Sequence, residues 1–429
     1  MLDAMLVLFK EQGWLKERQR QRTDSPHVLA KVRAIHRLIC VGEAMRFALN
    51  NLAIVAGDWV LAHSDPEWLD RYGHRIEESR LPRSQQDRQT IAEQIGRDGS
   101  QLLNDLYAPE APAFLREIPA VQILRRVWIQ NDVWVEGQLS FRGNEDLPPG
   151  KQFINSPYDQ EARYGKKRET RWTGYKVHLT ETCEDDAPHL IAHVTTVAAA
   201  ITDEAMTETI HAELEQTKLT PRQHVLDSGS ITAPILVSSQ QQYGIEVIGP
   251  ARGDVKWQAN TEGGIDASQF HIDWEQKLAI CPTGQRSINW TPAIDDRKNE
   301  VIKIKFSTTD CGRCPRQVDC IRSEKKSKRR TITVRPQAQH EALQAARRRQ
   351  KTAAFPRQYA LREGIEATMS QGVRAFGMRR SCYLGLAKTH LQHLSIAAAI
   401  NLVRVGAWLD GDDLAPTRIS AFQKLCFAA

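Results

Sequence analysis

Three acidic residues that lie far apart in the chain, Asp24, Asp227 and Glu366, are of the type that binds divalent cations. Cleavage of a phosphodiester bond needs an activated oxygen nucleophile and a stabilised leaving oxygen. Two Mg²⁺ or Mn²⁺ ions about 3.5–4 Å apart supply both, and such hard cations prefer carboxylate oxygens. The three carboxylates therefore predict a two-metal site that acts on a phosphodiester.

Glu366 has two neighbours that strengthen this interpretation. Tyr359, Arg362 and Glu366 have the spacing i, i+3 and i+7, which places them on one face of a helix. A surface salt-bridge stripe explains Arg362 and Glu366 but leaves Tyr359 without a reason. The planar guanidinium of Arg362 suits either orienting Glu366 or binding a phosphate.

The two aspartates have ordinary alternative roles. Asp24 precedes Ser25 and Pro26 at the end of a short extended segment, where an aspartate also serves as a helix N-cap. Asp227 follows an apolar strand and precedes Ser228-Gly229, a context equally typical of a turn. Asp159 also precedes a strand and is a second candidate for the first carboxylate.

Four cysteines, Cys281, Cys311, Cys314 and Cys320, lie within forty residues of one another. The Cys-Gly-Arg-Cys segment has the two-residue gap that lets neighbouring thiolates bind one tetrahedral ion. A structural Zn²⁺ ion is the expectation, and reduced cysteines in a small core are the alternative.

The 429 residues are 41% apolar and 26% charged, which is typical of a soluble globular protein, and we expect no membrane span. The net charge of +6 is modest, but basic residues gather in the runs 10–22, 163–171, 325–330, 347–351 and 374–388. Solvated helix faces explain any single run, whereas five together favour nucleic acid. The expected DNA-binding residues are Tyr359 and Arg362 before Glu366 and four residues of the basic run after it: Arg374, Arg379, Arg380 and Lys388.

Helical and strand periodicities alternate along the chain. The predicted helices span 28–63, 204–219, 234–243, 337–349, 356–372 and 386–409. The predicted strands span 174–179, 190–195, 224–227 and 246–249. Between 253 and 334 the pattern is irregular, with a short strand at 301–306. This order predicts a mixed α/β protein.

The Tyr359-x2-Arg362-x3-Glu366 arrangement resembles the signature of bacterial insertion-sequence transposases of the DDE type, which have an RNase H-like catalytic core. The segments around Asp24 and Asp227 are similar to the first and second aspartate motifs of that family, and the family pattern favours Asp24 over Asp159. The resemblance implies metal-dependent cleavage and strand transfer of DNA. Its implied partners are terminal inverted repeats, target DNA and a second copy of the chain in the synaptic complex, and its implied location is the cytoplasm, at the nucleoid.

The chain departs from the family pattern at several positions. Val373 stands where the signature has a lysine, and Arg374 follows it. Pro26, Ser228 and Ser230 differ from the usual residues of the two aspartate motifs. Only 23 residues precede Asp24, so the start looks shortened relative to the family. These departures motivate two alternatives, an inactive zinc-containing DNA-binding remnant and an RNase H-like nuclease that does not join strands.

The resemblance gives the fold class as an RNase H-like mixed sheet flanked by helices, with a helical insertion and a cysteine-containing β-rich insertion. The expected organisation is a first core segment with Asp24 (1–33), the helical insertion (34–150), core strands and helices with Asp227 (151–252), the cysteine insertion (253–335) and a C-terminal helical part with Glu366 (336–429).

Overall fold

The structure is a computed structural model that describes the whole chain except residues 33–34, 323–327, 413–421 and 423–429. Within this described part, seven strands form one mixed sheet, in which β6 pairs with four others. The strands of this sheet are β1 (Gln21–Asp24), β2 (His27–Leu29), β5 (Arg163–Lys167), β6 (Thr170–Thr182), β7 (Ile191–Ala198), β8 (Gln223–Val225) and β9 (Glu246–Ile248). The mixed α/β class predicted from the sequence is confirmed.

Strands β1 and β2 follow one another along the same side of β6. Asp24 pairs with Leu179 and His27 pairs with Lys176, so the antiparallel register continues across the two residues between them. The ladder is interrupted at Pro26, because proline has no N–H to donate, although the Pro26 carbonyl still accepts from Val177 N at 3.3 Å. The helix predicted over 28–63 was therefore wrong at its start: β2 comes first and α2 begins at Arg37.

Strand β1 lies in the middle of the sheet, antiparallel to β6 and parallel to β8, and β8 is parallel to β9. Helices α7 (Asp203–Gln216) and α8 (Ala233–Tyr243) connect β7, β8 and β9. The predicted alternation of strands and helices from 174 to 249 is thus found, with bounds that differ by a few residues.

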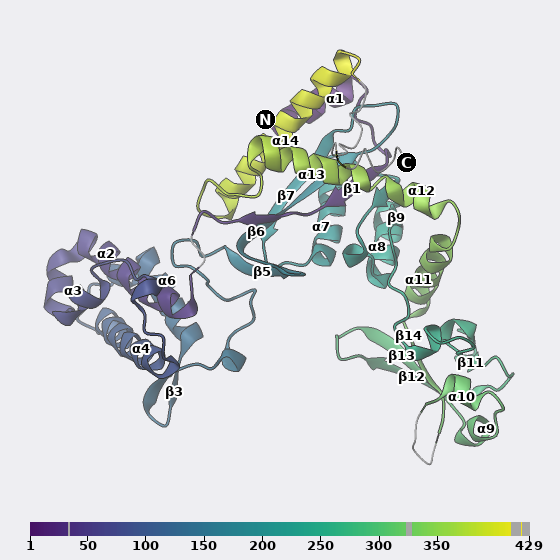
Figure 1. Cartoon of the computed structure of the whole chain (residues 1–429), viewed down its shortest axis with the longest axis horizontal. Helices are drawn as coiled ribbons and strands as arrows, with labels where there is room; N and C mark the ends of the chain where they lie inside the picture. Colours follow the sequence, from purple (N-terminus) through teal and green to yellow (C-terminus); the bar gives the residue numbers. More distant parts are fainter. Residues whose placement is uncertain (33–34, 323–327, 413–421, 423–429) are drawn as a thin grey trace.

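Helices cover both faces of the sheet. Successive residues of a strand point to opposite faces, and Thr23 faces the side of α7 whereas Arg22 faces the side of α13 (Glu363–Phe376). Helix α14 (Leu386–Leu409) packs along β7, and α1 (Leu2–Glu11) packs against α14 (Figure 1). Leu6, Tyr175 and Ile400 belong to the hydrophobic core that these elements share.

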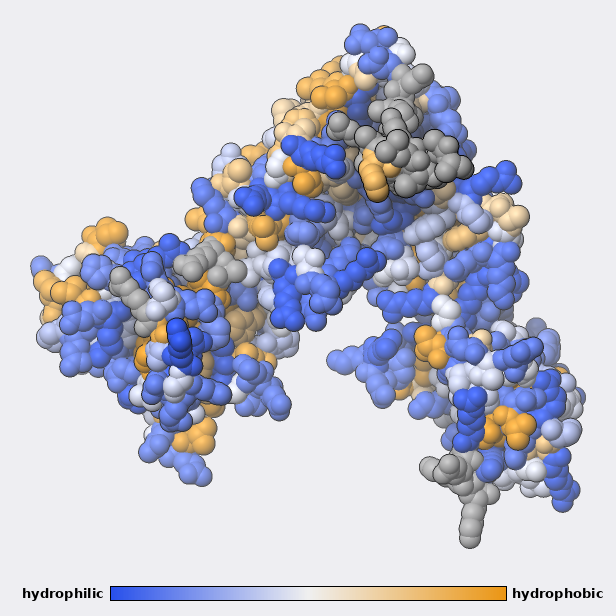
Figure 2. Space-filling model, viewed as in Figure 1, coloured by the Kyte–Doolittle hydropathy of each residue, from blue (hydrophilic) through white to orange (hydrophobic). Residues whose placement is uncertain are grey.

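A helical part lies between β2 and β5 in the chain and to one side of the sheet, where it forms a lobe at the left of the molecule (Figure 1 and Figure 2). It contains α2 (Arg37–His63), α3 (Glu67–Tyr72), α4 (Gln85–Tyr107), α5 (Phe114–Glu117), α6 (Pro119–Asn131) and the hairpin β3 (Asp132–Val135) with β4 (Gln138–Phe141). These helices enclose a separate apolar core, and the chain leaves and returns at one place: Leu29 and Arg163 pair with opposite sides of Gly174. A Cβ atom at Gly174 would lie 2.3 Å from the Val28 carbonyl oxygen, so the strands approach closely only because this residue is glycine.

Helix α2 is long and apolar enough to cross a membrane by length and composition. More than half of its most apolar stretch is buried, and Val41, Met45 and Leu52 face the core of the helical part. The helix is accounted for by this packing, with a kink at Ala56, whose φ is −152° and ψ 53°.

The cysteine-containing part lies at another side of the sheet and has its own small apolar core around Phe270, Ile304 and Phe306 (Figure 1). Its elements are β10 (His271–Asp273), β11 (Leu278–Ile280), β12 (Ser287–Ile294), β13 (Glu300–Phe306), α9 (Thr308–Gly312), α10 (Gln317–Cys320) and β14 (Thr331–Val334). The strand predicted over 301–306 corresponds to β13.

Helix α11 (Gln337–Gln350) leads from the cysteine-containing part back to the sheet. The single helix predicted over 356–372 is divided into α12 (Phe355–Ala360) and α13, with Leu361 and Arg362 between them. Both residues keep right-handed helical dihedrals, and Arg362 N donates to Tyr359 O at 2.9 Å in the tighter i to i+3 pattern. The backbone at this junction is therefore wound more tightly than an α-helix, and the chain does not reverse its direction there.

Candidate active site

Asp24 and Asp227 lie at the carboxyl ends of neighbouring parallel strands. Gln21 pairs with His224 and Arg22 with Val225, so the same register, continued by two residues, places Asp24 level with Asp227. Both side chains are half-buried, and both line one small cavity together with Thr23, His178 and Asp203. The chain thus brings together two carboxylates that are about two hundred residues apart in sequence.

Arg362 joins Asp24 to Glu366. Its Nη2 atom lies 2.9 Å from Asp24 Oδ2 and its Nη1 atom lies 2.9 Å from Glu366 Oε1. The guanidinium is 15% exposed, Asp24 18% and Glu366 64%, so the bridge runs from the sheet edge toward solvent. The predicted proximity of Arg362 to Glu366 on one helix face is found, and its contact with Asp24 is an additional link.

The electrostatics of the site connect all three acidic residues. Burial disfavours the charge of Arg362, but the attraction of Asp24 and the hydrogen bond to Glu366 outweigh burial and raise its pKa. Burial also raises the pKa of Tyr359, and the negative charges of Asp227, Asp24 and Glu366 act in the same direction. Asp227 therefore lies within electrostatic reach of the Arg362 side chain and of Tyr359.

Tyr359 is held by packing. Its ring stacks on Phe355 with 5.7 Å between ring centroids, and both rings pack against Val225 and Ile248 at the ends of β8 and β9. This contact docks α12 against the two parallel strands. It therefore also sets the backbone position of Arg362, which follows α12 in the chain. A packing role accounts for the tyrosine that the salt-bridge interpretation left unexplained.

The donor set suits a hard cation in its chemistry, because Asp24, Asp227 and Glu366 all offer carboxylate oxygens. Among the described residues, however, no three His, Cys, Asp or Glu side chains are already arranged to hold a metal ion. Asp24 Oδ1 and Asp227 Oδ1 each accept from the following backbone N–H, of Ser25 and Ser228, at 2.8 and 2.7 Å. The positive charge between Asp24 and Glu366 is that of Arg362, whose side chain has to move for a cation to contact both.

Asp159, the second candidate for the first carboxylate, lies at a different place. It is 3% exposed, and both of its oxygens accept from the Tyr175 hydroxyl at 2.7 Å. The backbone N–H groups of Glu161, Ala162 and Gly385 donate to it as well. These five hydrogen bonds tie the start of α14 to β6 and leave the carboxylate fully engaged.

A buried hydrogen-bond chain beneath Asp24 was not predicted. The Thr23 hydroxyl lies 2.6 Å from His224 Nε2, His224 Nδ1 lies 2.8 Å from His211 Nε2, and His211 Nδ1 contacts the Ser239 hydroxyl. Burial lowers the pKa of His211 to about 4, and it also holds the pKa of His224 well below its ordinary value. The only sequence signal was a histidine inside the apolar strand that ends at Asp227.

The four basic residues expected to bind DNA, Arg374, Arg379, Arg380 and Lys388, all have exposed side chains. The backbone of 379–381 pairs with Leu29, whose N–H donates to Arg379 O and whose carbonyl accepts from Ser381 N, both at 2.8 Å. This pairing holds the two neighbouring arginines beside the end of β2. Of the basic run 325–330, residues 325–327 lie outside the described part.

The four cysteines line one cavity in the cysteine-containing part. Burial raises the pKa of Cys320 to about 11, with the other three cysteines acting in the same direction, so the four sulfur atoms lie near one another. The backbone N–H of Arg330 donates to Cys311 Sγ at 3.4 Å. The four sulfur atoms are close together, but within the described ranges they are not arranged in the geometry that would bind a metal ion.

In a comparison with known protein families, residues 280–406 match the model described as a transposase DDE domain. This match supports a DDE-type transposase, in agreement with the resemblance seen in the sequence. The matched range includes β13, Arg362, the helix with Glu366 and most of α14, whereas Asp24 and Asp227 precede it. A search of curated proteins found no match.

Proposed function

We propose that the chain is a DNA transposase that cleaves and transfers the strands of an insertion sequence in a metal-dependent reaction. The observation that carries this proposal is the convergence of Asp24 and Asp227 on neighbouring parallel strands, with Glu366 joined to Asp24 through Arg362. Residues of these types at the end of a sheet form the expected ligand set for a cation pair. The match to the transposase DDE domain supports the same conclusion.

The sheet supports an RNase H-like core. Its strands run in the order β7-β6-β1-β8-β9, with β6 antiparallel to its neighbours and β1, β8 and β9 parallel to one another. The first proposed ligand follows β1 and the second follows β8, the two central parallel strands. The helical part and the cysteine-containing part are then insertions into this core.

Asp24, Asp227 and Glu366 would hold two Mg²⁺ or Mn²⁺ ions. Such ions supply activation of the nucleophilic oxygen and neutralisation of the leaving oxygen. The protein fixes the two aspartates on rigid strands and lets Glu366, which is 64% exposed, approach from a helix. Arg362, once released from Asp24, presents a two-pronged donor to a DNA phosphate.

Four cysteines, Cys281, Cys311, Cys314 and Cys320, would hold a structural Zn²⁺ ion. Their shared cavity supports this proposal, as does the small size of the apolar core around them. DNA phosphates would lie against Arg374, Arg379, Arg380 and Lys388. Tyr359 would act by docking α12, and Arg362 by contacting the phosphate. Terminal inverted repeats, target DNA and a second copy of the chain are the proposed partners, in the cytoplasm at the nucleoid.

The test uses the full chain with labelled DNA in Mg²⁺ or Mn²⁺. We expect cleavage, and joining of a labelled 3′ end to a supercoiled plasmid. Asp227→Asn and Glu366→Gln should lower both rates by roughly 10³-fold, since a catalytic metal contributes several kcal/mol. Glu363→Gln is the matched control, because Glu363 is an exposed glutamate in the first turn of the same helix.

Two other outcomes have defined meanings. DNA binding without cleavage by the unaltered chain would indicate an inactive DNA-binding remnant. Cleavage without joined products would indicate a nuclease. Cleavage that persists in Asp227→Asn would contradict the proposed ligand set.

A further inference from the structure

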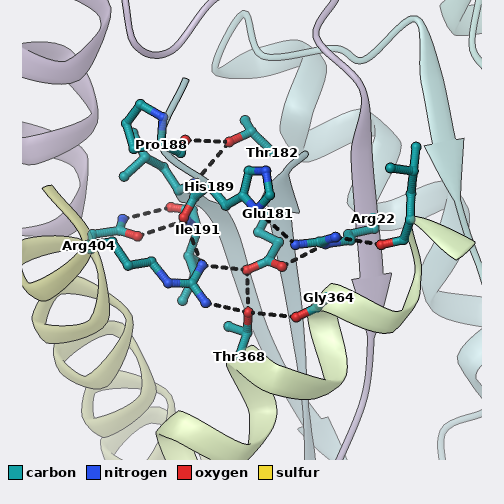
Figure 3. A network of polar contacts seen from close by, with 12 residues as sticks. Arg22, Glu181, Thr182, Pro188, His189, Ile191, Gly364, Thr368 and Arg404 are labelled. Carbon is teal, nitrogen blue, oxygen red and sulfur yellow. Dashed lines mark hydrogen bonds and ion pairs between the residues drawn. The ribbon is translucent and has the colours of Figure 1, made fainter. Parts of the chain in front are cut away.

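A buried glutamate, Glu181 on β6, lies between two arginines from different parts of the chain (Figure 3). Arg22 Nε lies 2.7 Å from its Oε1 atom, and Arg404 Nη1 lies 2.7 Å from its Oε2 atom. Glu181 is fully buried and the Arg22 side chain is 6% exposed. Strand β1 is thereby linked to α14 through a single carboxylate.

A third contact brings in α13. The Thr368 hydroxyl donates to Glu181 Oε2 at 2.6 Å, and Arg404 Nη2 donates to the Thr368 oxygen. Arg22 Nη1 donates to the carbonyl of Leu361, and Arg22 Nη2 lies 3.2 Å from His189 Nδ1. The four side chains Arg22, Glu181, Thr368 and Arg404, called here the Glu181 cluster, are thus joined by direct hydrogen bonds.

The Glu181 cluster is placed next to each part of the candidate active site except Asp227. Arg22 is two residues before Asp24 on β1 and points to the same face of the sheet. Thr368 is two residues after Glu366 on α13, and Leu361 directly precedes Arg362. The cluster therefore holds the strand of one proposed metal ligand against the helix of another.

The close approach of α13 to β1 depends on Gly364. A Cβ atom at this position would lie 2.1 Å from Arg22 Nη1, so any larger residue would displace the guanidinium. Helix α13 contains a glycine at the point where Arg22 passes beneath it to reach Leu361. The absence of a side chain at Gly364 therefore leaves the space that the Arg22 guanidinium occupies.

Simple stabilisation does not explain such a cluster, because buried ion pairs are often no more stabilising than apolar residues of the same volume. What a hydrogen-bonded ion pair adds is a defined geometry. We propose that Glu181 is a positioning residue, which sets the separation between Asp24 and Glu366 by fixing Arg22 and Thr368 on one carboxylate. This inference rests on the proposed function for its catalytic consequence.

The test compares Thr368→Val with Thr368→Ser in the full chain. Valine keeps the shape but removes the hydroxyl, whereas serine retains it. Hydrogen–deuterium exchange of the amides of 363–369 reports whether α13 is held, independently of any metal. We expect faster exchange in Thr368→Val and normal exchange in Thr368→Ser.

The catalytic consequence is measured on the same variants. Mn²⁺ binding, followed by electron paramagnetic resonance, should weaken about tenfold in Thr368→Val. DNA cleavage should fall roughly 10- to 100-fold, since small displacements of a catalytic group have effects of that size. Glu184→Gln is the control: Glu184 pairs with Arg20 at 2.8 Å near the other end of β1, and among the described residues its side chain bonds only to Arg20 and Arg222, not to α13.

The outcomes separate the two proposals. Unchanged exchange, Mn²⁺ affinity and cleavage in a folded Thr368→Val variant would overturn the positioning role. Exchange that is faster in Thr368→Ser as well would also overturn it, because the hydroxyl would then be irrelevant. If Asp227→Asn leaves Mn²⁺ binding and cleavage unaltered, the proposed function fails, and the exchange comparison still decides whether the Glu181 cluster holds α13.

Discussion

Arg362 contacts Asp24 through Nη2 at 2.9 Å, although 338 residues separate them in the sequence. The other prong of the same guanidinium contacts Glu366 at 2.9 Å. A single side chain therefore contacts both the strand β1 and the helix α13 that contribute acidic residues to the candidate site. Its position also means that Arg362 and a cation compete for the same carboxylate oxygens.

This competition predicts that Arg362→Ala strengthens Mn²⁺ binding to the DNA-free protein. The ion pairs are partly exposed and worth about 1 kcal/mol, so the affinity should rise about fivefold. Cleavage should nevertheless fall at least tenfold, because the phosphate loses its two-pronged donor. Arg362→Lys is the comparison, since it keeps the charge and loses the fork. Weaker Mn²⁺ binding in the alanine variant would contradict the competition.

The buried histidines predict a loss of stability in mild acid. Burial lowers the pKa of His211 to about 4, whereas an unfolded histidine titrates near 6.5. Between these values the unfolded chain binds more protons than the folded one, so stability is retained above pH 6.5 and falls as the pH drops toward 4. From pH 7 to pH 5 this histidine should account for about 2 kcal/mol.

Urea unfolding at pH 7 and pH 5 measures this effect. His211→Gln should reduce the difference between the two pH values, and His74→Gln, which changes an exposed histidine, should leave it unaltered. An equal pH dependence in all three proteins would show that His211 does not carry it.

The helical part contains a glycine that packing requires. A Cβ atom at Gly99 on α4 would lie 1.9 Å from the ring of Trp128 on α6. Although alanine is the better helix former, we expect Gly99→Ala to destabilise the protein by about 1–3 kcal/mol through overpacking. Gly406 on α14 has no atom within 4 Å of such a Cβ, so Gly406→Ala should be stabilising by up to about 1 kcal/mol. Thermal unfolding followed by circular dichroism distinguishes the two signs.

The cysteine cavity predicts about one Zn²⁺ per chain, since four thiolates complete one tetrahedral site. Cys314→Ser should abolish binding, and Cys382→Ser, which changes an exposed cysteine outside the cavity, should not. The rings of Trp274 and Trp290 are 5.5 Å apart in this part of the chain, so tryptophan fluorescence should change when a chelator removes zinc. Purified chain without zinc, and with unchanged fluorescence on zinc addition, would contradict the prediction.

The sequence allowed prediction of the elements whose patterns are local. Strand β8 was expected because an apolar run ends at Asp227, and a helix over 356–372, which corresponds to α12 and most of α13, was expected because Tyr359, Arg362 and Glu366 recur at helical spacing. The strand β2 was missed, since the apolar spacing of the residues after Val28 resembles a helix, whereas pairing with β6 decides the structure. The division at Leu361 was missed for a similar reason: it depends on Arg22, which is distant in the chain.

The Glu181 cluster could not be predicted from the sequence. Charged residues such as Arg22 and Glu181 are ordinarily exposed, and only the cross-strand register of β1 and β6 places these two opposite each other. Burial then follows from α13 and α14 covering that face of the sheet. No local pattern records such a contact.

The anchoring of the helical part at Gly174 has a consequence for variation in chain length. Because Leu29 and Arg163 flank one residue of β6, their strands are only about 10 Å apart, two strand spacings. A linker of a few residues spans that gap. Deletions or additions between β2 and β5 thus leave the strand order of the sheet intact, and this junction is where relatives of different size should diverge.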